Sequence, residues 1–421
     1  MKRTKLFAWL TVAFSLLPLC CKAQTYEQLW RDIDGYVRMD LPASVVSTAD
    51  KIYAKGQTER NIPQMMKAFI VRAEYRGNIA PDSLVIEKDR LKRWAETETD
   101  PLGRAVLNCI VGDMVLNSPR HDVDEAVRYF ESSLANKRML VKASAKDYYP
   151  MTNSGWLSKK YFGDSMFDLL ARQAIRSLSS ASRFDSMPEQ EAAFSFYDDL
   201  IAHYESVGDR TAAFLCKESK LVFRYENMGI FKKYHSTVNE KVSELLSLVS
   251  QYKGLPVCAD AYLKAASYCL NAGNKVKAVE VAQQGLKEYP KGEWTADLRK
   301  VMDNVKHAEI TVSIPFIYPE RDTEVKVSFA NVTDVTLELY RLNLSPASKA
   351  LSEDNWSSLL KKYGSKVASR KYSLAPSADY SRQDTTLRYT LPQAGIYVLK
   401  QIAHGCLLYT SPSPRDVEES R

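Results

Sequence analysis

The sequence lacks the residue patterns that most metal and redox centres need. Its 421 residues include seven cysteines and five histidines, and no two cysteines are spaced as Cys-x-x-Cys. This absence excludes zinc ribbons and thioredoxin-like redox motifs. Wide spacing favours surface or hydrogen-bonded roles for the histidines, which are His121, His203, His235, His307 and His404. We therefore expect neither a bound metal nor a cofactor.

The chain also lacks the short motifs that carry common enzyme chemistry. It contains no G-x-x-x-x-G-K-[ST] phosphate loop, no G-x-G-x-x-G, no H-E-x-x-H and no G-x-S-x-G. The acidic pairs Asp122/Asp124 and Asp198/Asp199 lie in helical patterns, where solvated faces and helix N-termini explain them. We expect a protein that is not an enzyme and has no catalytic residues.

A strong excess of one charge is missing as well. The formal net charge is +7, but Lys2, Arg3, Lys5 and Lys22 belong to an N-terminal leader, so the 58 basic residues fall to 54 against 51 acidic ones. Nucleic-acid binding draws on counterion release by basic groups gathered on one face. The balance of charges therefore excludes nucleic acid as the expected partner.

Long hydrophobic runs are confined to the start of the chain. The apolar run from Leu6 to Leu19 is about 14 residues, short of the roughly 20 that a spanning helix needs. With its cationic start, it predicts a signal peptide over residues 1–23, cleaved between Ala23 and Gln24. Lipidation at Cys20 or Cys21 is the alternative. We expect an exported protein, periplasmic, outer-membrane-associated or extracellular, with no transmembrane segment in the mature chain.

Few cysteines follow the leader, and their number is odd. They are widely spaced, and we interpret them as buried apolar thiols and not as a disulfide framework: Cys109, Cys216, Cys258, Cys269 and Cys406.

Residues 24–307 repeat apolar side chains at helical spacing and predict an α-helical repeat domain. In the best-formed unit the spacing matches the tetratricopeptide pattern, in which small residues let two antiparallel helices approach closely. Its predicted packing residues are Tyr262, Ala265, Ala266, Cys269, Gly273, Ala278, Ala282, Gly285 and Pro290. Because one hairpin cannot bury its apolar face alone, we expect several to stack.

Residues 308–405 change to a period of two and predict half-buried strands. Five alternating segments, with a helical insertion at about 350–365, indicate an incomplete antiparallel β-sandwich. The fold class predicted for the whole chain is therefore α+β with several domains. Residues 406–421 contain two Ser-Pro steps, and we expect a non-native or disordered tail there.

The order of these parts resembles the N-terminal part of bacterial alpha-2-macroglobulin family proteins. The segments that carry the resemblance are "YYPMTNSGWLSKKYFGDSMFDLLARQAIRSL", "EITVSIPFIYPERDTEVKVSFANVTDVTLELYRL" and "TTLRYTLPQAGIYVLKQIA". The resemblance implies a macroglobulin-like sandwich and a role in protease trapping, with proteases as partners. In that family a cut bait segment closes the molecule, and in many members a Cys-Gly-Glu-Gln thioester acylates the protease.

The sequence departs from the family where that chemistry lies, because no cysteine is followed by Gly-Glu-Gln. The resemblance therefore implies a scaffold or docking part of a protease-trapping inhibitor, without its bait and thioester regions. The alternative is a freestanding periplasmic adaptor, whose stacked helical repeats bind another protein on a concave surface.

Overall fold

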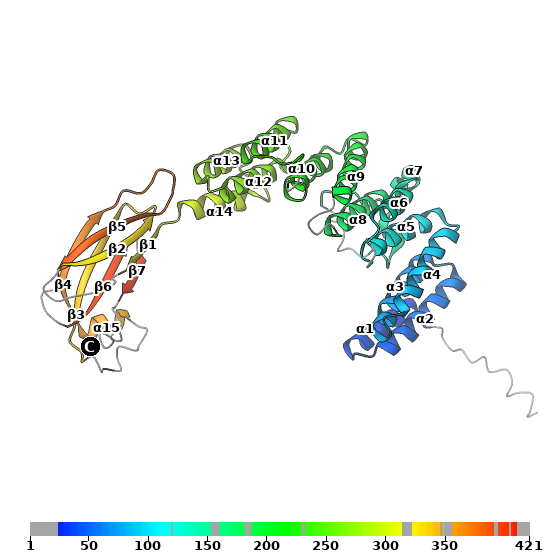
Figure 1. Ribbon diagram of the computed structural model, residues 1–421, viewed down its shortest axis with the longest axis horizontal. Coiled ribbons are helices and arrows are strands. Elements are labelled where there is room, and N and C mark those ends of the chain that lie inside the picture. Colours follow the sequence, from blue (N-terminus) through cyan, green and yellow to red (C-terminus); the bar gives the residue numbers. More distant parts are fainter. Residues whose placement is uncertain are drawn as a thin grey trace, which may run out of the picture. The chain divides into compact units, whose positions relative to one another are not determined.

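The computed structural model describes residues 24–118, 121–152, 160–181, 187–229, 232–313, 322–345, 348, 356–390, 395–403 and 406–410 (Figure 1). Within these ranges the chain is mostly helical and ends in two antiparallel sheets, which confirms the predicted α+β composition. The predicted signal peptide lies outside the described residues, except that Gln24 precedes the first helix. No helix in these ranges combines the length and apolarity needed to cross a membrane.

The chain divides into two compact units, residues 1–234 and 235–421. The regular structure in the described part of the first unit is helical. Its elements are α1 (Tyr26–Arg38), α2 (Pro42–Glu59), α3 (Ile62–Ile79), α4 (Ser83–Thr97), α5 (Pro101–Leu116), α6 (Val123–Leu134), α7 (Lys137–Lys142), the short 3-10 helix η1 (Ala145–Tyr148), α8 (Met166–Ala181), α9 (Met187–Ser206) and α10 (Arg210–Glu226).

Local sequence signals determine where several of these helices begin. Thr25 caps α1 in a capping box with Gln28, so that side chains satisfy backbone N–H groups that have no partner within the helix. The side chain of Asp100 accepts a hydrogen bond from the backbone N–H of Gly103 at the start of α5, and Pro101 occupies the first turn. Capping residues of this kind indicate in the sequence where a helix begins.

The second unit begins with α11 (Val238–Gln251), α12 (Cys258–Asn271), α13 (Lys275–Glu288) and α14 (Thr295–Lys306). Strand β1 starts at Glu309, close to residue 308, where the sequence places the change of structure. The Asn331 side chain donates hydrogen bonds of 2.8 and 2.9 Å to the carbonyls of Val305 and His307. Helices α11–α14 thus belong to the same compact unit as the sheets.

Seven strands form the two sheets: β1 (Glu309–Ser313), β2 (Asp322–Ala330), β3 (Asp334–Leu342), β4 (Gly364–Ser373), β5 (Gln383–Thr390), β6 (Ile396–Ala403) and β7 (Cys406–Thr410). All described pairings are antiparallel, in the orders β1-β2-β5 and β4-β3-β6-β7. Helix α15 (Trp356–Tyr363) lies within the predicted helical insertion.

One hydrophobic core joins the two sheets. Alternate residues of β1, β2, β3 and β6 turn inward, as half-buried strands require. The core residues on these strands are Val312, Val325, Val327, Phe329, Val335, Leu337, Leu339, Tyr397, Leu399 and Ala403.

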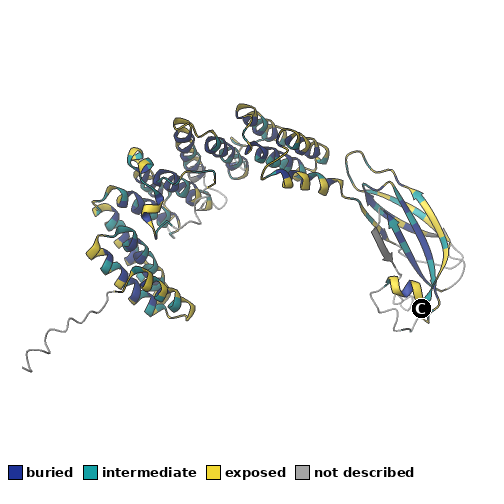
Figure 2. Ribbon diagram, turned by 180° about the vertical axis from the view of Figure 1, so that it is seen from behind, coloured by how far each residue is buried: buried dark blue, intermediate teal, exposed yellow. Residues whose placement is uncertain are grey.

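The alternation of apolar and polar residues does not predict strand β4. Its side chains are mostly exposed and include Lys366, Arg370 and Lys371, so no apolar alternation marks it (Figure 2). It lies at the edge of its sheet, and its register against β3 shifts at Val367. Lysines and bulges of this kind discourage the pairing of an edge strand with another chain.

The sequence predicts a non-native or disordered tail over residues 406–421, and the structure differs from this prediction in the first five of these residues. Residues 406–410 form β7, which pairs with β6 in a register that joins Ala403 to Cys406 and Leu399 to Thr410. The apolar residues Leu407, Leu408 and Tyr409 continue a strand pattern up to the Ser-Pro steps. Residues 411–421 lie outside the described residues.

Candidate functional site

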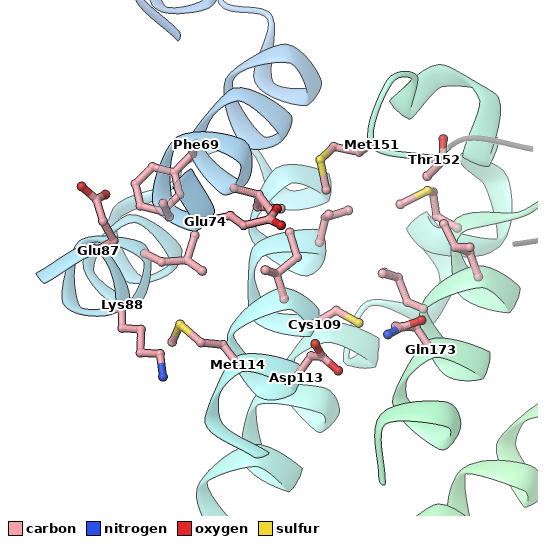
Figure 3. Close-up of a pocket in the computed structure, with 18 of the residues that line it drawn as sticks. Phe69, Glu74, Glu87, Lys88, Cys109, Asp113, Met114, Met151, Thr152 and Gln173 are labelled. Atoms are coloured by element: carbon pink, nitrogen blue, oxygen red, sulfur yellow. The ribbon is translucent and has the colours of Figure 1, made fainter. Parts of the chain in front are cut away.

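A cavity of about 480 Å³ opens among the helices of the first unit, and we call it the α5 groove (Figure 3). Helices α3 and α4 form one side, α5 forms the floor, and α8 forms the other side. Its lining is mostly apolar and includes Phe69, Ile70, Ala73, Leu84, Leu91, Val106, Cys109, Ile110, Met114, Met151, Met166, Leu169 and Leu170. The volume lies in the range of ligand-binding clefts, about 300–1,000 Å³.

Helix α5 is apolar around most of its circumference, so it has two faces to cover. One face packs against α6, where a Cβ at Gly112 would lie only 2.9 Å from Cε1 of Phe130. Val106, Cys109 and Ile110 line the groove. The groove is therefore formed by an apolar helix surface that its packing against α6 does not cover.

An ion-pair network fixes the α3–α4 side of the groove. Glu87 accepts hydrogen bonds from Arg72 (3.1 Å), Arg76 (2.8 Å) and Arg90 (3.0 Å), and its side chain is only 3% exposed. Asp50 on α2 pairs with Arg72 and Arg76 at 3.2 and 3.1 Å. Burial opposes ionisation, but the hydrogen bonds and charges of the arginines outweigh it, so the pKa of Glu87 lies below its ordinary value.

The segment between η1 and α8 forms another part of the wall. The backbone N–H of Ala145 donates a 2.7 Å hydrogen bond to the carbonyl of Asp164, and the Thr152 hydroxyl donates to the carbonyl of Ala145. Met151 and Thr152 consequently lie beside the groove (Figure 3). Residues 153–159 lie outside the described residues.

Two polar residues that line the groove, Gln173 on α8 and Asp113 on α5, are linked through Ser177, which lies on α8 outside the lining. The Gln173 Nε2 donates to Ser177 Oγ at 3.1 Å, and Ser177 Oγ donates to Asp113 Oδ1 at 2.5 Å. The Oε1 atom of Gln173 is buried without a hydrogen-bond partner among the described residues. This order of donors leaves Asp113 and Gln173 with acceptor capacity that no described residue uses.

The thiol in the groove is not an activated nucleophile. Burial, reinforced by the nearby Asp113 charge, raises the pKa of Cys109 well above its ordinary value. Cys109, Cys216, Cys258 and Cys269 are buried, as the sequence predicts, and none of these four forms a disulfide. In the described part of the chain, no group of three or more His, Cys, Asp or Glu side chains is arranged to hold a metal ion.

The predicted repeat-packing residues lie together on the hairpin of α12 and α13. The side chains at most 2% exposed are Tyr262, Ala265, Ala266, Cys269, Ala278 and Ala282. Gly285 faces Tyr262 so closely that a Cβ there would lie 2.7 Å from the Tyr262 Cβ.

The ends of the two helices of this hairpin are set by residues of the same predicted pattern. Gly273 connects α12 to α13 with a φ of +77°, a conformation that favours glycine. Pro290 follows α13 on the surface, where it cannot continue a helix. These residues serve packing and turn geometry, and they do not line the α5 groove.

Sequence reasoning did not predict the α5 groove or its polar residues. The one available signal is Asp113, which is the only charged residue in the mostly apolar stretch 105–116. No family model and no curated protein matches the chain. The resemblance to the alpha-2-macroglobulin family therefore remains a prediction from the sequence.

Proposed function

We propose that this protein is a docking scaffold that binds an apolar segment of a partner polypeptide in the α5 groove. The observation that carries the proposal is the groove itself, a mostly apolar cleft that neighbouring helices leave open. A helical array commonly binds an extended or helical segment in this way. The groove accepts apolar anchors, and its few polar groups can orient them.

Methionine is the second feature that supports a polypeptide partner. Met114, Met151 and Met166 come from three different parts of the lining. The unbranched thioether side chain adapts its shape to different apolar surfaces, and protein-binding grooves use it for that purpose. A groove of this composition suits apolar side chains of varied shape.

For the whole protein we propose two settings, and the order of the elements supports the first. In the first, the helical array and the following antiparallel sheets are the N-terminal scaffold of an exported alpha-2-macroglobulin-like protease inhibitor. In the second, the chain is a freestanding periplasmic adaptor with tetratricopeptide-like repeats. Genomic sequence beyond residue 403 separates them, because further macroglobulin domains favour the first and a stop codon the second.

The docking proposal is tested by filling the groove. Ala73 on α3 lines it, whereas Ala54 on α2 is exposed elsewhere, so Ala73→Trp and Ala54→Trp form a matched pair. A phage library of random 12-residue peptides is selected on the full chain, and the affinity of the best peptide is measured by fluorescence anisotropy. We expect Ala73→Trp to weaken binding more than tenfold and Ala54→Trp less than twofold.

Circular dichroism must first show that both variants keep the helical content of the wild type. Failure to select any peptide would contradict the docking proposal. Equal binding by wild type and Ala73→Trp would contradict it too, because the bound peptides would then use another surface.

A separate prediction concerns covalent protease capture. Incubation of the chain with a panel of proteases should give no hydroxylamine-sensitive, protease-linked band on denaturing gels. Acylation needs an activated thioester, and no cysteine precedes Gly-Glu-Gln. Burial also raises the pKa of Cys216 to about 12 and that of Cys269 above its ordinary value. A linked band that hydroxylamine releases would refute the prediction.

A further inference from the structure

We infer that the α5 groove selects partner segments that carry a lysine or arginine beside their apolar anchors. This inference rests on the proposed docking function and adds the chemistry of the partner. It follows from two carboxylates that face the groove, one on α3 and one on α5, whose charges nothing in the described chain neutralises. A cationic side chain of the partner would supply the missing counter-charge.

Glu74 and Asp113 are the two carboxylates. Both are directed toward the space in front of α5, whereas the ammonium group of Lys88 points away from that space (Figure 3). Lys88 is the only basic residue that lines the groove among the described residues. Among the described lining residues, Glu74 and Asp113 therefore carry the negative charges that no arginine or lysine pairs with.

Glu74 and Asp113 differ from Glu87, which lines the same groove, in the partners that their carboxylates have. Glu87 pairs with three arginines, so its negative charge is already compensated within the chain. Among the described residues, Asp113 accepts a side-chain hydrogen bond from the neutral hydroxyl of Ser177 alone, and Glu74 has neither a hydrogen bond nor an ion pair. The first carboxylate stabilises the wall, and the other two remain available to a ligand.

Gln173 adds an uncharged acceptor to the same side of the groove. Its Nε2 donates to Ser177 Oγ, and its buried Oε1 has no hydrogen-bond partner in the described part of the chain. Lysine and arginine side chains carry donors and no acceptors, so they match a set made of two carboxylates and a carbonyl oxygen. An apolar anion such as a fatty acid has the opposite character and would be repelled.

The apolar lining strengthens the attraction between the groove carboxylates and a cation. Asp113 is half-buried among the apolar side chains of the lining, in a medium of lower dielectric constant than water, where attraction to a cation is stronger. Glu74 is exposed, so it lies where an incoming cation first meets the groove. Apolar contacts would supply most of the affinity, and the charged contact would supply the selectivity. We thus expect the same peptides to bind more weakly, and not to lose binding altogether, when the charge is removed.

The test begins with the peptides selected on the full wild-type chain, synthesised with blocked termini. We expect them to be enriched in lysine or arginine, and replacement of that residue by glutamine to weaken binding five- to tenfold. On the Glu74→Gln/Asp113→Asn variant the same replacement should change affinity less than twofold. Glu205→Gln, an exposed position on α9, is the matched control and should behave as wild type.

A second measurement does not depend on the double variant folding. Raising the salt concentration from 50 to 500 mM should weaken binding of the basic peptide to wild type several-fold and leave the glutamine peptide unaffected. Peptides that Ala73→Trp weakens, but that show neither basic preference nor salt dependence, would overturn this inference and leave the docking function standing. Absence of any groove-dependent peptide would instead overturn the docking function.

The same groove is probed with sodium dodecanoate below its micellar concentration, using isothermal titration calorimetry on the wild type. We expect no saturable heat, because the carboxylate head would meet Glu74 and Asp113. Saturable dodecanoate binding that Ala73→Trp abolishes would overturn the inference, since the groove would then accept an apolar anion.

Discussion

Replacing Glu87 with glutamine should lower the free energy of unfolding of the first unit by about 3 kcal/mol. Glu87 is almost fully buried and pairs with Arg72, Arg76 and Arg90. Removal of its charge leaves the guanidinium of Arg72, itself only 10% exposed, with Asp50 as its remaining ion-pair partner among the described residues. The cost falls at the lower end of the range for a broken buried pair, because Asp50 still compensates part of the arginine charge.

The effect of this substitution should depend on pH in a defined direction. The folded-state pKa of Glu87 lies below that of an unfolded glutamate, so the ionised carboxylate stabilises the fold at neutral pH. The difference between wild type and Glu87→Gln should be complete above a pH of about 4.3 and shrink as the pH falls through the folded-state pKa. A difference that grows on acidification would contradict the assigned role.

Urea unfolding followed by circular dichroism at pH 7 and pH 4 measures both effects. Glu205→Gln is the control, because Glu205 pairs with Lys217 at 2.6 Å but its side chain is 49% exposed. An exposed pair contributes about 0–1 kcal/mol. If Glu87→Gln were no more destabilising than Glu205→Gln, the buried network would not be what holds α3 and α4 together.

Hydrophobic periodicity predicts the regular elements because their side chains have one environment on each face. The stripe of Tyr262, Ala266 and Cys269 repeats at the helical period, and all three are buried on α12. Val325 and Val327 alternate with polar neighbours on β2 and contribute to the core between the sheets. In both α12 and β2, the spacing of apolar residues in the sequence predicts which face is buried.

Hydrophobic periodicity does not predict strand β4 or the α5 groove. Strand β4 forms because its backbone pairs with β3. Backbone hydrogen bonds do not require a particular order of apolar and polar side chains, so the sequence of this edge strand shows no alternation. The groove brings together Glu74, Asp113 and Gln173 from three helices. Their proximity depends on how the helices pack, and local sequence does not contain that information.

The predicted hairpin packing leads to the second large effect. Gly285→Ala should destabilise the second unit by about 1–3 kcal/mol, although alanine is the better helix former by about 1 kcal/mol. A Cβ at Gly285 would lie 2.7 and 2.9 Å from Cβ and Cγ of Tyr262 and 3.2 Å from Cδ1 of Leu298. The Tyr262 Cβ is fixed to the α12 backbone, so relief requires the two helices to separate.

Gly35→Ala is the matched control, because Gly35 also lies within a helix but a Cβ added there would meet no atom within 4 Å. There the gain in helix propensity acts alone, and the first unit should become more stable by about 0.5–1 kcal/mol. Urea unfolding of both variants tests the pair of opposite signs. Stabilisation by Gly285→Ala would mean that α12 and α13 do not approach as closely as the tetratricopeptide-like spacing requires, and the proposed repeat packing would fail.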